Sequence, residues 1–331
     1  MLLVTGGLVL LAWFAYLWLK PIPAPYEYQQ IATGDATQFS DLELDAWPDL
    51  AISQYNVQVA GIDKPLGQAT LAQRGNKPPV LINWKNYTNE LLISIDRKSS
   101  ELSALATAIG KHAAKDALVL AWWDTSRQIN LLSERDTLFT SHLNTPLITL
   151  GTWQNQQAAI QRYENEFWNT SASQQEQDQF QRFSEALLAA PEEGVAQLRA
   201  LIGSSREAYL VVHVTDLYKI GLMHPDKIGV AYKNFPLTGN MHGMINHMKV
   251  HLKENNYATY TLQSLSETEI RAYFLLDSQS TNTLLAKMLP FTDQTAPTEL
   301  EVAPLIYQHG GYWVYRIPGS IKTVDDGSNA P

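Results

Sequence analysis

The stretch ALVLAWW at residues 117–123 is followed by Asp124 and by a helical pattern over 125–132. A continuous apolar run of this kind is typical of a central strand that is buried on both faces. A second run, YLVVHV at 209–214, precedes Asp216 in the same way. Such runs alternating with helices favour an α/β fold, with a mainly parallel or mixed sheet flanked by helices.

The neighbouring segments extend this alternation. Residues 80–84 and 91–95 are short apolar runs, and Ser99 or Ser100 is expected to cap a helix with apolar residues at helical spacing. Further along the chain, the patterns predict a mostly helical segment at 155–206 with a new helix from Pro191, a helix at 241–253, and strands at 270–276 and 312–317.

The predicted organisation has four parts. Residues 1–20 form a transmembrane anchor, and residues 21–79 form a proline-rich stalk and a small β-rich region. Residues 80–320 form the α/β soluble domain. The polar segment 321–331 is expected to be a flexible tail.

The anchor rests on an uncharged apolar run, LLVTGGLVLLAWFAYLWL, at residues 2–19. As a helix this run spans about 27 Å, which matches the hydrocarbon core of a bilayer. Interfacial residue types gather near its carboxyl end: Trp13, Tyr16, Trp18 and Lys20. The alternative is a cleaved signal peptide, whose apolar region is usually shorter and ends in a small-residue cleavage site.

The composition excludes several classes of protein. The 24 Lys and Arg against 33 Asp and Glu give a net charge of −9, which argues against nucleic acid as a partner. The absence of cysteine excludes disulfides, thiolate metal sites and covalently attached c-type haem. An acidic, cysteine-free body fits export, so we expect a single-pass protein of the bacterial inner membrane with a periplasmic soluble domain.

The first candidate site lies where the two strongest strands end. Trp122, Trp123 and Asp124 end the first run and Asp216 follows the second, and ligands of α/β sheets bind beyond the carboxyl ends of strands. The two carboxylates therefore predict a site for a cation or a polar partner. The alternative is that Asp124 caps the next helix and the tryptophans fill the core. Aromatic residues near the end of the chain, including Tyr312 and Trp313, are a further candidate partner surface.

A second candidate site lies on the predicted helix at 241–253. Met244, His247, Met248 and His251 are at helical spacing, and thioether with imidazole suits copper. The alternative is a helix whose methionines are core residues and whose histidines are solvated. No cofactor other than this possible copper ion is expected.

The sequence carries no G-x-S-x-G, P-loop, H-E-x-x-H or G-x-G-x-x-G motif, so no enzymatic activity is expected. Glu164 and Glu166 are expected on a solvated helix face, and His213 is expected to be a hydrogen-bonded core histidine. Gly310 and Gly311 predict a tight hairpin or a close backbone approach.

Residues 118–138, LVLAWWDTSRQINLLSERDTL, resemble the start of the soluble domain of the oligosaccharyltransferase catalytic subunit. In that family a strand ends in Trp-Trp-Asp, which reads the acceptor peptide, and Trp122, Trp123 and Asp124 match this triplet. The many-span catalytic half of that family has no counterpart here. The resemblance therefore implies a related fold and, as an alternative function, a sugar- or peptide-binding domain.

The whole chain also resembles the hydroxylamine oxidation protein HaoB, a family encoded beside octahaem hydroxylamine oxidoreductase. The shared features are one N-terminal span, a cysteine-free body, Ala-Trp-Trp-Asp at 121–124 and Gly-Tyr-Trp-Val-Tyr-Arg at 311–316. The resemblance implies a non-catalytic accessory protein that tethers, assembles or docks hydroxylamine oxidoreductase or another periplasmic multihaem cytochrome. The copper-handling protein remains a second alternative.

Overall fold

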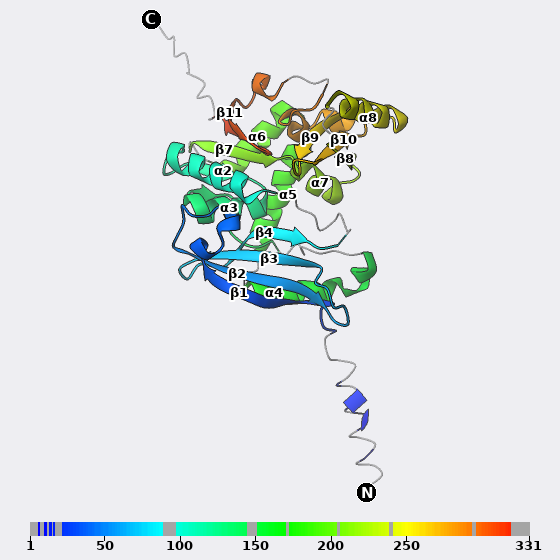
Figure 1. The fold of residues 1–331 in the computed structure, drawn as a ribbon. Coiled ribbons are helices and arrows are strands. Elements are labelled where there is room, and N and C mark those ends of the chain that lie inside the picture. The colour runs from blue at the N-terminus through cyan, green and yellow to red at the C-terminus, as the bar shows by residue number, and fades with distance from the viewer. Residues whose placement is uncertain are drawn as a thin grey trace, which may run out of the picture.

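The computed structural model describes residues 6, 10–11, 13–14, 16, 22–88, 97–143, 151–169, 172–203, 206–237, 241–292 and 296–318. These residues form a mixed α/β fold, as expected, in which helices pack around sheets of five, four and three strands (Figure 1). Most of the expected anchor at 2–19, the run at 91–95 and the tail at 321–331 lie outside the described residues. Within the described part, no helix has the length and apolar character needed to cross a bilayer.

The five-stranded sheet is mixed and has the order β11-β12-β7-β5-β6. Strands β5 (Leu118–Leu120), β6 (Asp136–Thr137) and β7 (Ala208–His213) are parallel to one another. Strand β12 (Tyr312–Ile317) has the predicted bounds and runs antiparallel to β7, and β11 (Leu305–His309) forms the edge.

Strand β5 is shorter than the expected 117–123. Trp122 occupies the N-cap position of helix α3 without a side-chain capping hydrogen bond, and Trp123 is already the first residue of that helix (Trp123–Ser133). The Ser126 hydroxyl donates to the carbonyl of Ala121 at 3.0 Å, and Asp124 places a negative charge in the first turn of the helix. The acidic first turn favours a helix start here, although the apolar run continues past it.

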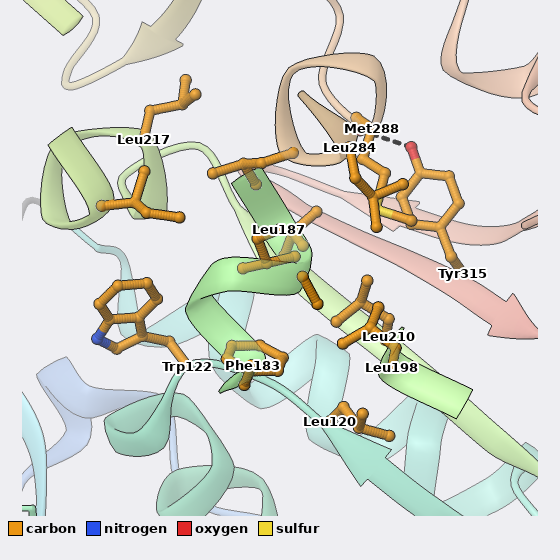
Figure 2. Packing of buried hydrophobic residues seen from close by; sticks show 14 of the residues in the cluster. Leu120, Trp122, Phe183, Leu187, Leu198, Leu210, Leu217, Leu284, Met288 and Tyr315 are labelled. Carbon is orange, nitrogen blue, oxygen red and sulfur yellow. Dashed lines mark hydrogen bonds between the residues drawn. The ribbon is translucent and has the colours of Figure 1, made fainter. Parts of the chain in front are cut away.

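Helices cover both faces of this sheet. Leu118 and Leu120 face a core cluster with α5 (Gln174–Leu188) and α6 (Pro191–Ile202), while Val119 and Ala121 face α2 (Ser99–His112) and α3. Figure 2 shows the first cluster, in which the Tyr315 hydroxyl donates to the carbonyl of Met288. The expected serine cap of α2 is wrong, because Lys98 occupies the capping position and no side chain caps the helix.

The four-stranded sheet follows the stalk and is antiparallel throughout. Its strands are β1 (Tyr26–Asp35), β2 (Leu50–Val59), β3 (Gly67–Arg74) and β4 (Val80–Asn86). Strand β4 therefore extends this sheet beyond residue 79, where the sequence suggested a boundary. Helix α4 (Gln157–Trp168) packs against the sheet through a cluster of aromatic and aliphatic side chains.

The three-stranded antiparallel sheet has the order β8-β10-β9. Its strands are β8 (Val230–Pro236), β9 (Thr259–Ser264) and β10 (Glu269–Leu275), and α8 (Met241–Glu254) packs on one face. Helix α7 (Asp216–Met223) contacts β8 and follows β7. The short elements that complete the described fold are η1 (Ala36–Gln38), η2 (Ser40–Leu42), η4 (Gly151–Gln156), α9 (Ser278–Thr281), α10 (Leu284–Lys287) and η5 (Pro297–Glu299).

Candidate functional site

The two carboxylates expected at the carboxyl edge of the sheet lie close together. Asp124 follows β5 and Asp216 follows β7, and these strands are parallel neighbours. The ammonium of Lys219 joins them: its Nζ lies 3.2 Å from Asp124 Oδ1 and 3.1 Å from Asp216 Oδ1. The cation expected at this edge is therefore supplied by the chain itself.

A second cation occupies the other oxygen of Asp124. Arg97 Nη2 lies 2.7 Å from Asp124 Oδ2, and Arg97 Nη1 donates to Thr125 Oγ1 at 2.7 Å. The side chains of Arg97 and Asp124 are only 10% and 13% exposed. Burial opposes ionisation of Asp124, but Arg97 and Lys219 outweigh it and hold the pKa of the carboxyl well below its usual range.

His213 lies at the end of β7 beside these charges and is fully buried. Its Nδ1 accepts from the backbone amide of Thr215 at 3.2 Å and contacts the Thr215 hydroxyl at 2.7 Å. Burial, together with the positive charges of Arg97 and Lys219, lowers the pKa of His213 well below its ordinary value. The ring is therefore neutral at pH 7, and the prediction of a hydrogen-bonded core histidine is confirmed.

The hairpin between β11 and β12 closes the site from the other side. Glu101 Oε2 accepts from the backbone amide of Gly311 at 2.8 Å and lies 4.0 Å from His213 Nε2. Gly310 has a φ of +54°, a left-handed conformation that favours glycine. A Cβ at Gly311 would overlap the His213 ring. Both the expected tight turn and the expected close approach are therefore confirmed.

Gly311→Ala should lower the free energy of unfolding by about 1–3 kcal/mol, because the added methyl group forces the buried His213 ring out of place. Gly110→Ala in helix α2 is the matched control, since its Cβ would meet no atom nearer than 3.7 Å. The control should stabilise the protein by about 0.5–1 kcal/mol. Urea unfolding of both variants measures the difference, and equal effects would contradict this account.

We use the name buried ion network for Arg97, Glu101, Asp124, His213, Asp216 and Lys219. Beside it lies a pocket lined in part by Arg97, Gln128 and Tyr312, with a volume of about 20 Å³. That volume is about the space that one water molecule occupies. Within this network, Arg97 and Lys219 pair with Asp124 and Asp216, while Glu101 accepts from the Gly311 amide beside the neutral His213 ring.

The aromatic candidates are mostly core residues. Trp122 and Trp123 are 4% and 6% exposed, and the Trp122 ring packs edge-on against Phe180. Figure 2 shows Trp122 and Phe183 in the same buried cluster. Tyr312 is fully buried with its ring 4.4 Å from that of His213, while Trp313 is half-buried on the opposite face of β12.

Helix α8 places its candidate copper ligands in different surroundings. Met244 and Met248 are buried in the cluster against the three-stranded sheet, whereas His247 is exposed. The His251 ring is half-buried, with Phe235, Tyr257 and Phe274 beside it. The described residues contain no group of three or more His, Asp or Glu side chains placed to hold a metal ion. Copper binding through the methionines stays a prediction.

Glu164 was expected on a solvated helix face, and this expectation is wrong. The residue is fully buried, and its carboxylate accepts from the Tyr26 hydroxyl, from the Tyr28 hydroxyl at 2.9 Å and from Trp168 Nε1 at 2.6 Å. Burial raises the pKa of Glu164, against the effect of these three donors. One sequence signal points to burial: Glu164 is four residues from both Ile160 and Trp168, on the apolar face of the helix.

Comparison with known proteins identifies one matching family. The family model HaoB_nitrify, described as HaoA-associated protein HaoB, matches residues 1–317. No curated protein matches the chain. Among solved structures, the C-terminal domain of C. jejuni PglB shows a weak resemblance, with 11% identity, a TM-score of 0.38, and coverage of 65% of this chain and 99% of that domain.

Proposed function

Because the chain belongs to the HaoB family of HaoA-associated proteins, we propose that it is a non-catalytic accessory protein that tethers, assembles or docks hydroxylamine oxidoreductase. The observation that carries this proposal is the family match, which extends over residues 1–317 and so includes the N-terminal segment as well as the folded body. The family is one of accessory proteins. The finer assignment is a membrane-anchored periplasmic subunit that holds the multihaem enzyme at the membrane.

The geometry of the buried ion network favours a structural role over catalysis. A general base needs a carboxylate or imidazole within hydrogen-bond reach of a substrate. Here both oxygens of Asp124 are occupied by Arg97 and Lys219, and Asp216 also accepts the amide of His213 at 2.9 Å. The network links β5, β7 and the segment before α2, so its role is to hold these parts of the fold together.

The arrangement of the sheets supports tethering. Strand β1, which follows the proposed anchor and stalk, lies at one end of the described body, and β11 lies at the other (Figure 1). With residues 2–19 in the bilayer, the five-stranded sheet would project away from the membrane surface. Tethering raises the local concentration of a partner without any new chemistry. A net charge of −9 would favour a basic docking face on that partner.

Affinity capture from native membranes tests the proposal. We expect the full chain, carrying a C-terminal tag, to recover HaoA at about 50 mM salt and less of it at about 300 mM, since the docking of charged faces weakens as salt screens it. The untagged chain is the control for adventitious recovery, and haem staining together with mass spectrometry reads out the partner.

A variant without residues 2–19 separates anchoring from docking. It should leave the membrane fraction and still recover HaoA when both are mixed at low salt. Retention of this variant in the membrane fraction would contradict the anchor. Failure of the full chain to recover HaoA at low salt would contradict the docking proposal.

A further inference from the structure

A second pocket lies apart from the buried ion network, between the start of β4 and helix α3. Its lining residues are Lys77, Pro78, Val80, Arg127, Asn130, Leu131, Thr140 and Ser141. The volume is about 310 Å³, within the range of sites that bind small molecules. The pocket is therefore much larger than the water-sized pocket beside Tyr312.

Arg127 is the unusual group in this lining. The residue is 4% exposed, its Nη2 donates to the carbonyl of Pro79 at 2.7 Å, and its Nε is buried without a hydrogen-bond partner in the described structure. Its guanidinium carbon also lies 5.9 Å from the centre of the Trp168 ring. Burial lowers the pKa of Arg127 to about 10, so the side chain keeps its charge at pH 7.

Within the described residues, no carboxylate lies within ion-pair distance of Arg127, and the carboxylate of Asp124 acts on its charge only from beyond that distance. By contrast, Arg74, Arg97 and Arg206 each pair with an aspartate or a glutamate. A buried cation that no carboxylate contacts directly is destabilising unless another group supplies a negative charge at close range. Arg127 is one of the residues that line this pocket, so a bound anion has room to supply a negative charge beside it.

We propose that this pocket binds a small organic anion whose oxyanion group, a carboxylate or a phosphate, pairs with the guanidinium of Arg127. A guanidinium binds either group through two parallel hydrogen bonds. Lys77 is exposed and adds a positive charge to the lining, and the hydroxyls of Thr140 and Ser141 add donors. Pro78, Val80 and Leu131 provide an apolar wall for the body of the ligand. This site is independent of docking to HaoA.

Thermal unfolding of the full chain in detergent tests the proposal with three probes: inorganic phosphate, phenyl phosphate and benzoate. Each is compared with sodium chloride at equal ionic strength and pH 7. We expect at least one probe to raise the midpoint by about 2–5 °C, since a ligand that binds only the folded state stabilises it. Stabilisation by the two phosphates alone assigns a phosphate ligand, and stabilisation by benzoate alone assigns a carboxylate.

Arg127→Met should abolish the shift and weaken the affinity, measured by calorimetry, at least tenfold, because a charge-assisted bidentate pair is lost. Arg162→Met is the matched control on an exposed arginine and should keep the shift. Arg127→Lys keeps the charge but loses the planar guanidinium that binds through two hydrogen bonds, so it should weaken binding severalfold. This variant replaces Arg127→Met if the methionine variant does not fold. A wild-type chain that none of the probes stabilises, or an unchanged shift in the Arg127 variants, would overturn the proposal.

Discussion

Asp124→Asn should lower the free energy of unfolding by about 3–5 kcal/mol, because it leaves two buried cations without their shared counter-charge. Asparagine has nearly the same shape as aspartate, so the loss reports the missing charge rather than a cavity. Arg97 pairs with Oδ2 of Asp124 and Lys219 lies within 3.3 Å of both oxygens, and all three side chains are at most 13% exposed. Urea unfolding followed by tryptophan fluorescence measures the change.

Asp41→Asn is the matched control. Asp41 pairs with Lys85 at 3.3 Å, but these side chains are 57% and 47% exposed. Exposed pairs contribute at most about 1 kcal/mol, so this variant should be nearly as stable as the wild type. Equal losses in the two variants would contradict the proposed role of the buried ion network.

The same carboxylate should make the protein sensitive to acid. The pKa of Asp124 is lower in the folded state than in the unfolded chain, so the unfolded state binds more protons. The stability that Asp124 contributes is therefore fully present above the ordinary aspartate pKa of about 3.9 and is lost as the pH falls through the folded-state pKa. The Asp124→Asn variant should lack this contribution.

Glu164→Ala should cost about 3–5 kcal/mol of unfolding free energy. The substitution removes the acceptor of three buried donors, Tyr26, Tyr28 and Trp168, and each unsatisfied donor costs about 1–3 kcal/mol before local relaxation. Glu166→Ala is the matched control, two residues away on the exposed side of the same helix, and should change stability by about 0.5 kcal/mol or less. Similar losses in both variants would contradict burial of Glu164.

The pH dependence of Glu164 has the opposite sign to that of Asp124. Burial raises the pKa of Glu164, so the folded state binds the proton more tightly than the unfolded chain. This contribution to stability is complete below the ordinary glutamate pKa of about 4.3 and is lost as the pH rises through the folded-state pKa. Glu164→Gln cannot titrate, so unfolding measured across this range should show a flatter curve than the wild type.

The sequence predicts the elements whose patterns are long and regular. Strand β12, helix α8 and the start of α6 at Pro191 follow the expected positions closely. Strands β8 and β11 were not predicted, because most of their residues are only partly buried or exposed and show no clear alternation; β8, for example, has a single fully buried residue. An apolar run does not show where a strand ends. Strand β5 stops at Leu120, although the apolar run continues to Trp123.

The candidate site could be predicted only in part. Asp124 and Asp216 follow neighbouring parallel strands, so their proximity follows from the order of the chain. Their cations do not follow from it: Arg97 is 27 residues from Asp124, in the segment before α2, and Lys219 is 95 residues away on α7. Glu164 pairs with Tyr26 across 138 residues. Such contacts are set by the packing of whole layers and leave only a faint local pattern.

The hydrogen bond between Tyr26 and Glu164 has a mechanical consequence. Tyr26 is the first residue of β1, so any tension on the segment before it reaches this residue first. Strand β1 is at the edge of its sheet and is held there by its ladder to β2 and by the bonds of Tyr26 and Tyr28 to helix α4. A tether pulled from the N-terminal side would thus load two elements far apart in the chain at once, and Glu164 would set the force at which the first strand peels away.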